Sequence, residues 1–183
     1  MEQPKGLGGA QRVLVYGVTG SGKTTLAQEI SAATGLTYHA IDNLTWEPGW
    51  VEVPLAEQRR RVASICTQQA WVLDAAYGSW LDVVLERVEL VVALDYPRWF
   101  SLQRLVRRSL ARSLDKRPIC NGNFETLRSG FLQRDSIIQW HFTSFRRKRS
   151  RVDAWAADPD PPRVLRFRRA HETAAWLEFL QAS

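Results

Sequence analysis

The chain has 183 residues, of which 45% are hydrophobic and 24% charged, a composition typical of one folded domain and not of a disordered chain. No apolar run reaches the roughly 20 residues that a membrane helix needs, so we expect no membrane contact and a cytoplasmic location. The net charge of +6 attracts anions, either the phosphates of a small molecule or those of nucleic acid.

Short apolar runs predict five β-strands, at residues 12–16, 36–41, 71–75, 88–94 and 164–167. Stretches with helical periodicity or good helix formers predict five helices, at residues 23–33, 54–69, 98–113, 131–149 and 171–180. Strands that alternate with helices indicate an α/β fold, with a parallel sheet and helices on both of its faces. The two cysteines and three histidines show no spacing typical of a metal site.

The other segments are predicted from their composition. Residues 1–10 are expected to be a disordered leader, and residues 11–183 a single domain. Residues 46–54 (WEPGWVEVP) are predicted to form a loop, because they contain two prolines and a glycine. The polar stretch that begins at residue 113 interrupts the alternation of strands and helices, so we expect an inserted lid at about residues 113–151.

Two of the predicted helices have a recognisable apolar face. In the helix at 54–69, the positions expected to face the core are Leu55, Val62, Ile65 and Cys66. In the helix at 131–149, the apolar residues that recur at helical period are Phe131, Ile138, Phe142 and Phe145.

Residues 17–24 (GVTGSGKT) match the phosphate-binding pattern GxxxxGK(S/T), between a predicted strand and a predicted helix. Glycines let the backbone wrap closely around phosphates, and the following helix adds its positive N-terminal end. In such a loop Lys23 bridges the β- and γ-phosphates, and the Thr24 hydroxyl takes a magnesium position. The pattern therefore predicts binding of ATP with Mg²⁺. The residues expected to hold the nucleotide are Gly17, Thr19, Gly20, Ser21, Gly22, Lys23, Thr24 and Thr25.

A second magnesium ligand is expected from a carboxylate at the end of a neighbouring strand. Asp74 ends the third predicted strand, and Asp95 ends the fourth. We favour Asp74 and keep Asp95 as the alternative. The other possible role of Asp74 is to cap the turn that follows it.

Five segments with distinctive residues follow one another along the chain, at residues 17–25, 41–50 (IDNLTWEPGW), 71–74 (WVLD), 94–98 (LDYPR) and 121–125 (NGNFE). Together they resemble the adenylate kinase-like P-loop kinases, in particular the bacterial branch of DNA topology modulation (FlaR-like) proteins. The resemblance implies the P-loop nucleoside triphosphate hydrolase fold, with five parallel strands in the order 2-3-1-4-5. It also implies an acceptor-binding region after the second strand, a lid after the fourth, and transfer of the γ-phosphoryl group of ATP to a small acceptor.

The resemblance has one departure. Adenylate kinases proper carry a DGxPR block at the third strand, where this chain reads DAAYG at residues 74–78. The acceptor-binding region is also short here. Both differences argue against AMP as the acceptor.

Arg104, Arg108 and Arg112 recur at every fourth residue, so they place three guanidinium groups on one helical face. Such a face is either a solvated basic surface or an anion clamp. The resemblance implies the clamp, with Arg104 stacked near the adenine and Arg108 in reach of phosphate.

Further arginines follow in the second half of the chain. By the same resemblance, Arg134 with Asp135 matches the Arg-Asp pair after the lid, and Arg146 or Arg147 matches the later arginine. Both are expected to contact phosphate. The run at residues 146–151 (RRKRSR) carries more charge than one ligand needs, so part of it is expected to face solvent.

Asp42 follows the second predicted strand, so we expect it at the crevice beyond the carboxyl ends of the strands. A carboxylate there can orient or deprotonate an acceptor hydroxyl. The alternative is that Asp42 caps a turn together with Asn43.

Two functions agree with these residues. The first is a small-molecule kinase with a nucleoside or nucleotide acceptor, in which Lys23, Asp42 and Arg134 are catalytic. The second is a nucleic-acid-associated P-loop NTPase or regulator, favoured by the positive charge but without a helix-turn-helix or zinc-finger signature. The acceptor stays open at this stage, as does the choice between a monomer and a dimer.

Overall fold

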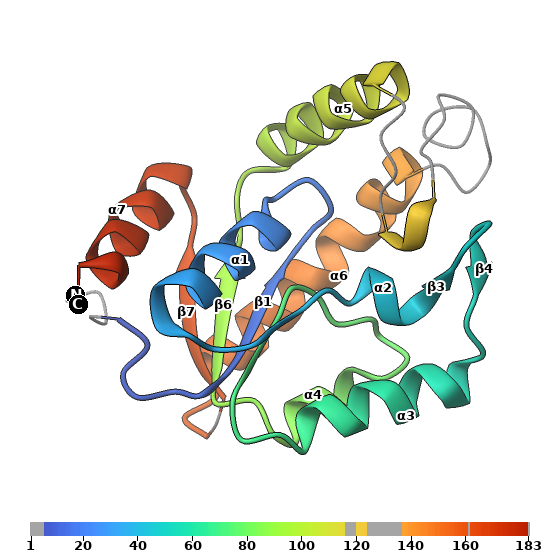
Figure 1. The fold of residues 1–183 in the computed structure, drawn as a ribbon. Coiled ribbons are helices and arrows are strands. Elements are labelled where there is room, and N and C mark those ends of the chain that lie inside the picture. The colour runs from blue at the N-terminus through green and yellow to red at the C-terminus, as the bar shows by residue number, and fades with distance from the viewer. Residues whose placement is uncertain (1–5, 116–119, 124–136, 161, 183) are drawn as a thin grey trace.

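A computed structural model of the protein describes residues 6–115, 120–123, 137–160 and 162–182. At its centre lies a parallel sheet of five strands in the order β2-β5-β1-β6-β7 (Figure 1). The strands are β1 (Arg12–Gly17), β2 (Tyr38–His39), β5 (Trp71–Leu73), β6 (Leu90–Leu94) and β7 (Arg163–Phe167). The predicted strand order 2-3-1-4-5 is confirmed, since the third, fourth and fifth predicted strands are β5, β6 and β7.

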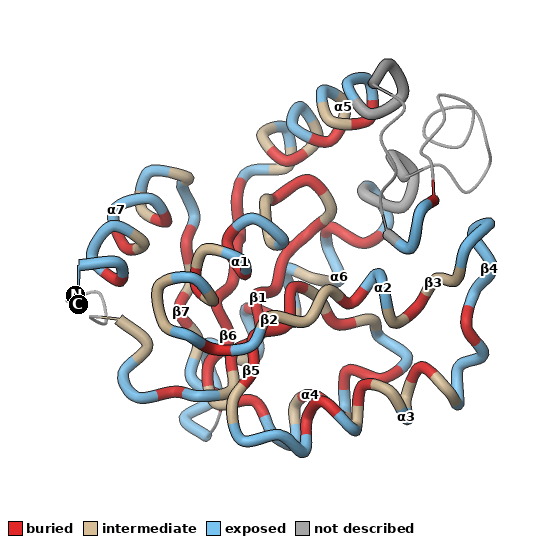
Figure 2. Tube along the Cα trace, viewed as in Figure 1, coloured by how far each residue is buried: buried red, intermediate tan, exposed pale blue. Residues whose placement is uncertain are grey.

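Helices cover both faces of the sheet. The longer ones are α1 (Lys23–Thr34), α3 (Leu55–Cys66), α5 (Arg98–Asp115), α6 (Ile137–Ala157) and α7 (Ala170–Gln181). On one face, Ile30 of α1 and Trp176 of α7 are buried in one cluster with β1. On the other face, Val62 of α3 and Val152 of α6 are buried in a second cluster. The strands between these layers are largely buried (Figure 2), as their continuous apolar runs predict.

The N-terminal turn contacts the body of the protein. Residues 6–10, which the composition assigned to a leader, form turns in which Leu7 packs against the core. The guanidinium group of Arg163 donates a hydrogen bond to the Leu7 carbonyl oxygen at 2.8 Å. Residues 1–5 of the predicted leader lie outside the described residues.

The predicted loop at residues 46–54 is wrong, because a small antiparallel hairpin forms there. Its strands are β3 (Trp46–Glu47) and β4 (Val51–Glu52). Gly49 and Trp50 have positive φ values of 81° and 59°, which close the turn between the strands. Proline and glycine mark the turn itself, whereas the flanking residues pair as strands. A short helix, α2 (Asp42–Thr45), leads into the hairpin.

The apolar face predicted for the helix at 54–69 needs one correction. Leu55, expected in the core, is 50% exposed, and Gln58 is buried in its place. The Gln58 amide donates to the Val53 carbonyl oxygen at 2.7 Å and accepts from the Trp80 indole at 3.1 Å. A buried glutamine is tolerated there because both ends of its amide are hydrogen-bonded. Trp80 precedes α4 (Leu81–Leu85), a short helix that the sequence did not predict.

The helix predicted at residues 131–149 continues to Ala157. Val152 and Phe145 are buried, whereas Phe142, predicted on the same face, is 45% exposed. The apolar face thus continues past the basic run, so the later part of the predicted lid belongs to a helix packed on the sheet. Phe131 and the other residues before Ile137 lie outside the described residues.

The register of α3 can be tested with a pair of alanine substitutions. Val62→Ala removes buried methyl groups and should lower the free energy of unfolding by about 2 kcal/mol. Leu55→Ala removes a half-exposed side chain and should change it by less than about 0.5 kcal/mol. Chemical denaturation of the two variants measures both values, and a larger loss for Leu55→Ala would contradict the observed register.

Candidate active site

The loop at residues 17–24 joins β1 to α1 and is closely packed. Gly20 and Gly22 have φ values of 84° and 97°, in the left-handed region that favours glycine. A Cβ atom on Gly20 would lie 2.4 Å from the Ser101 carbonyl oxygen, so α5 lies directly against the loop. These glycines therefore fulfil two needs, the left-handed backbone and the close approach of a helix.

Side chains of the loop turn back onto its own backbone. The Ser21 hydroxyl and the Lys23 ammonium both donate hydrogen bonds to the Val18 carbonyl oxygen, at 2.8 and 2.9 Å. Thr19 is half-buried in the loop, and Thr25 is exposed on the first turn of α1. The residues predicted for phosphate binding thus lie together at the N-terminal end of one helix, where an anion is favoured.

Asp74 follows β5 and collects three hydrogen bonds. One carboxylate oxygen accepts from the Thr24 hydroxyl at 2.8 Å and from the Tyr38 hydroxyl at 2.9 Å. The other oxygen accepts from the Ile41 backbone N–H at 3.0 Å. The side chain of Asp74 is therefore tied to the phosphate loop and to the segment that leads to Asp42, within a residue that is 7% exposed.

Asp95, the alternative magnesium ligand, has different partners. Its carboxylate accepts a hydrogen bond from the Arg166 guanidinium at 2.9 Å and forms an ion pair with Arg149 at 3.5 Å. These cations neutralise the carboxylate. Asp95 is thus paired with arginines, whereas Asp74 is hydrogen-bonded to Thr24 of the phosphate loop.

A second carboxylate follows directly after Ile41, the residue whose backbone N–H binds Asp74. Asp42 begins α2, and its oxygen accepts a hydrogen bond from the Tyr77 hydroxyl at 2.9 Å. Burial and the nearby Asp42 carboxylate raise the pKa of Tyr77, so the phenol stays protonated and can donate. Asp42 also lies within electrostatic range of Lys23. The structure thus brings Asp42 to the phosphate loop, as its position after β2 predicted.

Two asparagines far along the chain hold the hairpin that follows Asp42. Asn121 lies in the short 3-10 helix η1 (Cys120–Gly122), and Asn123 directly follows that helix. Asn121 donates to the Trp46 carbonyl oxygen at 2.6 Å. Asn123 donates to the Glu47 carbonyl oxygen at 3.1 Å and accepts from the Trp50 backbone N–H at 2.8 Å. The NGN block therefore positions the β3–β4 hairpin, a role that requires contacts across the fold and that the sequence did not reveal.

The arginines of α5 approach the phosphate loop. The Arg104 guanidinium lies 3.4 Å from the position that a Cβ atom on Gly22 would take, and it stacks over the Phe100 ring. Arg108 is close enough to Lys23 to lower the pKa of that lysine. The side chain of Arg112 and all of Arg134 lie outside the described residues. The structure thus brings the first two arginines of the predicted clamp to the loop.

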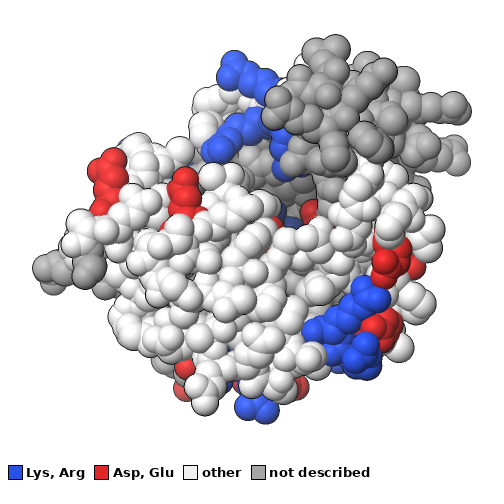
Figure 3. Space-filling view, in the orientation of Figure 1, with Lys and Arg blue, Asp and Glu red and all other residues white. Residues whose placement is uncertain are grey.

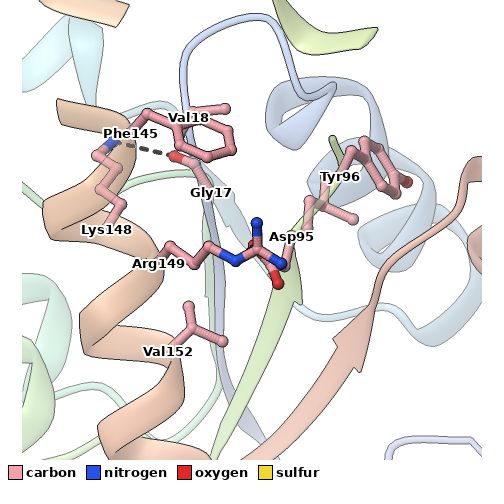
Figure 4. A pocket seen from close by; sticks show the side chains of 9 residues that line it. Gly17, Val18, Asp95, Tyr96, Phe145, Lys148, Arg149 and Val152 are labelled. Carbon is pink, nitrogen blue, oxygen red and sulfur yellow. Dashed lines mark hydrogen bonds and ion pairs between the residues drawn. The ribbon is translucent and has the colours of Figure 1, made fainter. Parts of the chain in front are cut away.

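The basic run of α6 is divided between different surroundings. Arg146 lines an open groove of about 310 Å³ with Arg98 and Asp153. Lys148 reaches the phosphate loop instead, since its ammonium donates to the Gly17 carbonyl oxygen at 2.9 Å. Figure 4 shows Lys148 pointing from α6 toward Gly17, next to a cavity of about 10 Å³, the size of one water molecule. Lys148 was not singled out from the sequence, where it is one of several basic residues in the run at 146–151.

Both lysines at the loop have lowered pKa values. Burial lowers the pKa of Lys23 to about 8, against the opposing effect of the Asp74 and Asp42 carboxylates. Burial also lowers the pKa of Lys148 well below its usual value, and the neighbouring cations Lys23, Arg147 and Arg151 lower it further.

Figure 3 shows a hollow on the face of the molecule turned to the viewer, with basic and acidic side chains visible inside it.

The five-stranded parallel sheet and the glycine loop before α1 define the P-loop nucleoside triphosphate hydrolase fold. Among solved structures, shikimate kinase from Acinetobacter baumannii in complex with shikimate has a TM-score of 0.56 at 17% identity, covering 93% of this chain and 90% of that one. Deoxyadenosine kinase from M. mycoides has a TM-score of 0.54 at 13% identity, over 93% and 96% of the two chains. Similarity at this level of identity establishes the fold alone.

Comparison by sequence gives less. No protein-family model matches the chain. The uncharacterized protein YqaC of Bacillus subtilis is 26% identical over 104 residues, which is 56% of this chain. The match spans 58% of YqaC. In the part of the chain that the structure describes, none of the helices is long and apolar enough to cross a membrane.

The packing of α5 on the loop can be tested at Gly20. Alanine there should lower the free energy of unfolding through its left-handed φ, at about 1–2 kcal/mol, and through overlap with Ser101, at about 1–3 kcal/mol more. Gly9→Ala is the matched control, because Gly9 has a φ of 82° with no atom within 4 Å of the added Cβ. Equal losses for the two variants in chemical denaturation would contradict the close contact.

Proposed function

We propose that this protein is an ATP-dependent phosphotransferase that moves the γ-phosphoryl group of ATP to a hydroxyl group of a small acceptor. The observation that carries the proposal is the hydrogen bond between Thr24 and Asp74 beside the Asp42–Tyr77 pair. It places two oxygen atoms suited to a metal ion and a candidate base beside one phosphate loop, after the neighbouring strands β5 and β2. The small-molecule kinases among the structures of similar fold support the same class of reaction.

The loop would hold the triphosphate. The N-terminus of α1 and the Lys23 ammonium supply positive charge, and Gly17, Thr19, Gly20, Ser21 and Gly22 shape the cradle. Arg104 lies over Gly22, where it would contact the nucleotide, and Arg108 would reach the phosphates near Lys23. Arg134 and Arg146 stay in the proposal as further phosphate contacts. Such fixed charges stabilise the charge that develops on the oxygens during transfer.

The donor set at the loop fits magnesium. Mg²⁺ prefers hard oxygen ligands, and the Thr24 hydroxyl and an Asp74 oxygen lie 2.8 Å apart. These two residues would hold the ion, with Asp74 oriented by Tyr38 and Ile41. When bound, the ion neutralises the β- and γ-phosphate oxygens. Asp95 is unsuited to this task because Arg166 and Arg149 already occupy its oxygens.

Asp42 would act on the acceptor. In the transfer, the bond between the γ-phosphorus and the bridging oxygen of ATP breaks, and the acceptor oxygen forms the new bond to phosphorus. The proton of the acceptor hydroxyl passes to the Asp42 carboxylate, while the hydrogen bond from Tyr77 keeps that carboxylate in place. The β3–β4 hairpin held by Asn121 and Asn123 would form a wall of the acceptor site.

The placement of the basic run favours a small acceptor over nucleic acid. Lys148 points into the loop, Arg149 toward Asp95, and Arg151 toward the Tyr16 hydroxyl at 3.4 Å. A surface that binds duplex DNA presents its cations outward to phosphates along the helix. Three cations of the run instead contact other groups of the protein.

A relation to the DNA topology modulation branch, a cytoplasmic location and a monomeric or dimeric state remain parts of the proposal.

The first test concerns Lys23. Lys23→Met should abolish acceptor-dependent release of ADP, because the ammonium is the charge placed between the β- and γ-phosphates. The unfolding midpoint of the variant should stay at or above that of the wild type, since a half-buried cation with a lowered pKa has been removed. A coupled ADP assay with a screen of nucleosides, nucleotides and hydroxylated metabolites measures the rate. Wild-type turnover by folded Lys23→Met would refute the assignment.

The second test compares the two aspartates. Asp74→Asn should raise the Mg²⁺ concentration needed for half-maximal rate by at least about tenfold, since a carboxylate ligand is lost. Asp95→Asn should leave this concentration unchanged within about twofold and lower the stability instead, because Arg166 loses one of its two carboxylate partners. Rates are measured on folded protein at increasing Mg²⁺. The opposite pattern would assign the metal to Asp95.

The third test uses pH. With a Lys23 pKa of about 8, the ammonium is charged below pH 8, and ATP affinity should not depend on this group there. Above pH 8 the amine must take up a proton when the triphosphate binds, so the affinity should fall as pH rises, by up to about tenfold per pH unit. Lys23→Arg, which stays charged, should remove this slope. Calorimetric titration with MgATP between pH 7 and 10 measures it, and an unchanged slope in Lys23→Arg would contradict the role of Lys23.

A further inference from the structure

Lys148 is a half-buried cation, and its contacts within the described part of the chain are a carbonyl oxygen and an aromatic ring. Its ammonium donates to the Gly17 carbonyl oxygen and lies 5.5 Å from the centre of the Tyr16 ring. Within the described ranges of the chain, no carboxylate lies at ion-pair distance from it. A carbonyl oxygen and an aromatic face stabilise an ammonium only in part, and burying such a group is costly.

The charges around Lys148 are mostly of its own sign. Lys23, Arg147 and Arg151 all act against its charged form, and Asp42 is the carboxylate that acts in its favour. Repulsion between like charges is strongest where water is excluded. This region of the crevice therefore carries a surplus of positive charge, which an anionic ligand would offset.

Arg151 extends this surplus toward Asp42. It lies one helical turn after Lys148 on α6, and its guanidinium contacts the Tyr16 hydroxyl at 3.4 Å. The same guanidinium lies 3.3 Å from the position that a Cβ atom on Gly78 would take. Gly78 directly follows Tyr77, the residue that donates to Asp42. Lys148, on which Asp42 acts electrostatically, and Arg151, beside Gly78, thus both lie near the candidate base.

The proposed triphosphate site already has its own cations. Lys23, Arg104 and Arg108 lie on or over the loop at the N-terminus of α1. Lys148 approaches the loop at its first residue, from α6 on the opposite face of the sheet (Figure 4). A ligand that contacts both Lys148 and Asp42 therefore enters from the acceptor side.

We propose that Lys148 and Arg151 bind an anionic group of the acceptor, a carboxylate or a phosphate, so that the acceptor is a small hydroxylated anion. This inference rests on the proposed phosphotransferase function and narrows its acceptor. The hydroxyl group that receives the phosphoryl group faces Asp42, and the anionic group faces α6. Neutral nucleosides and neutral sugars leave the cations without a partner and are poor acceptors.

The test compares neutral and anionic members of matched pairs in the ADP-release assay. Ribose is compared with ribonate and with ribose 5-phosphate, and thymidine with thymidine monophosphate. We expect the anionic members to be preferred by at least about tenfold in kcat/KM. The carboxylate and phosphate arms distinguish the two possible groups. A preference for neutral members would overturn the inference while leaving the phosphotransferase function intact.

Variants then assign the preference to Lys148. Lys148→Met should raise KM for the preferred anionic acceptor by at least about tenfold, a larger factor than its effect on the KM for ATP. Lys148→Arg keeps the charge and should retain part of the preference. Arg60→Met is the control, because it removes the same unit of charge from an exposed position on α3 paired with Glu57. A preference that persists in Lys148→Met would overturn the inference.

An equilibrium measurement separates this inference from the proposed function. The thermal unfolding midpoint of the protein saturated with MgADP is measured with each member of the panel. Anionic members should raise it in the wild type and in Arg60→Met but not in Lys148→Met. If no compound stimulates ADP release, the phosphotransferase function fails, and this measurement still decides whether Lys148 binds an anion. Equal shifts in all three proteins would show that it does not.

Discussion

The hydrogen bonds to the Asp74 carboxylate are the interaction on which the rest of the candidate site depends. Through them, one buried side chain fixes the Thr24 hydroxyl at the phosphate loop, the Tyr38 hydroxyl on β2, and the Ile41 backbone just before Asp42. Parallel strands place their carboxyl ends at one edge of the sheet, so a residue after β5 can reach both β1 and β2. A single carboxylate therefore links the loop proposed to hold a nucleotide with the residue proposed as the base.

Around this carboxylate the protein gathers more positive than negative charge. Burial lowers the pKa of Lys23 and of Lys148, so holding both ammonium groups at the loop works against stability. This cost is expected where a site must stabilise charge on transferring oxygens, and a bound polyanion would offset it. Asp95 gives a contrast within the same sheet, since Arg166 and Arg149 pair with it and Arg166 also pairs with Asp153, so that two cations meet two carboxylates. The imbalance is local to the crevice and supports the proposal that the crevice binds an anion.

The features that could be predicted are those that depend on local sequence. The glycine loop, the strand order and the position of Asp74 beside Thr24 follow from a motif, from apolar runs and from the geometry of parallel strands. The unpredicted features depend on contacts between distant segments. Asn123 contacts the hairpin only after the chain has passed through β6 and α5. Lys148 contacts the phosphate loop because of the direction in which it projects from α6, which the run of basic residues around it does not reveal. The exposure of Leu55 was mispredicted because Gln58 finds two buried partners, which no periodicity shows.

The central claim is that this crevice moves a phosphoryl group between two molecules and does not merely hydrolyse ATP. Following a radioactive label from the γ-phosphate of ATP tests it most directly, with the products separated after one turnover in the presence of each candidate acceptor. The account predicts that the label appears in an organic phosphate ester, that this product requires Asp42, and that DNA does not change its yield by more than about twofold. Label recovered only as inorganic phosphate with every acceptor, at a rate that DNA raises tenfold or more, would contradict it.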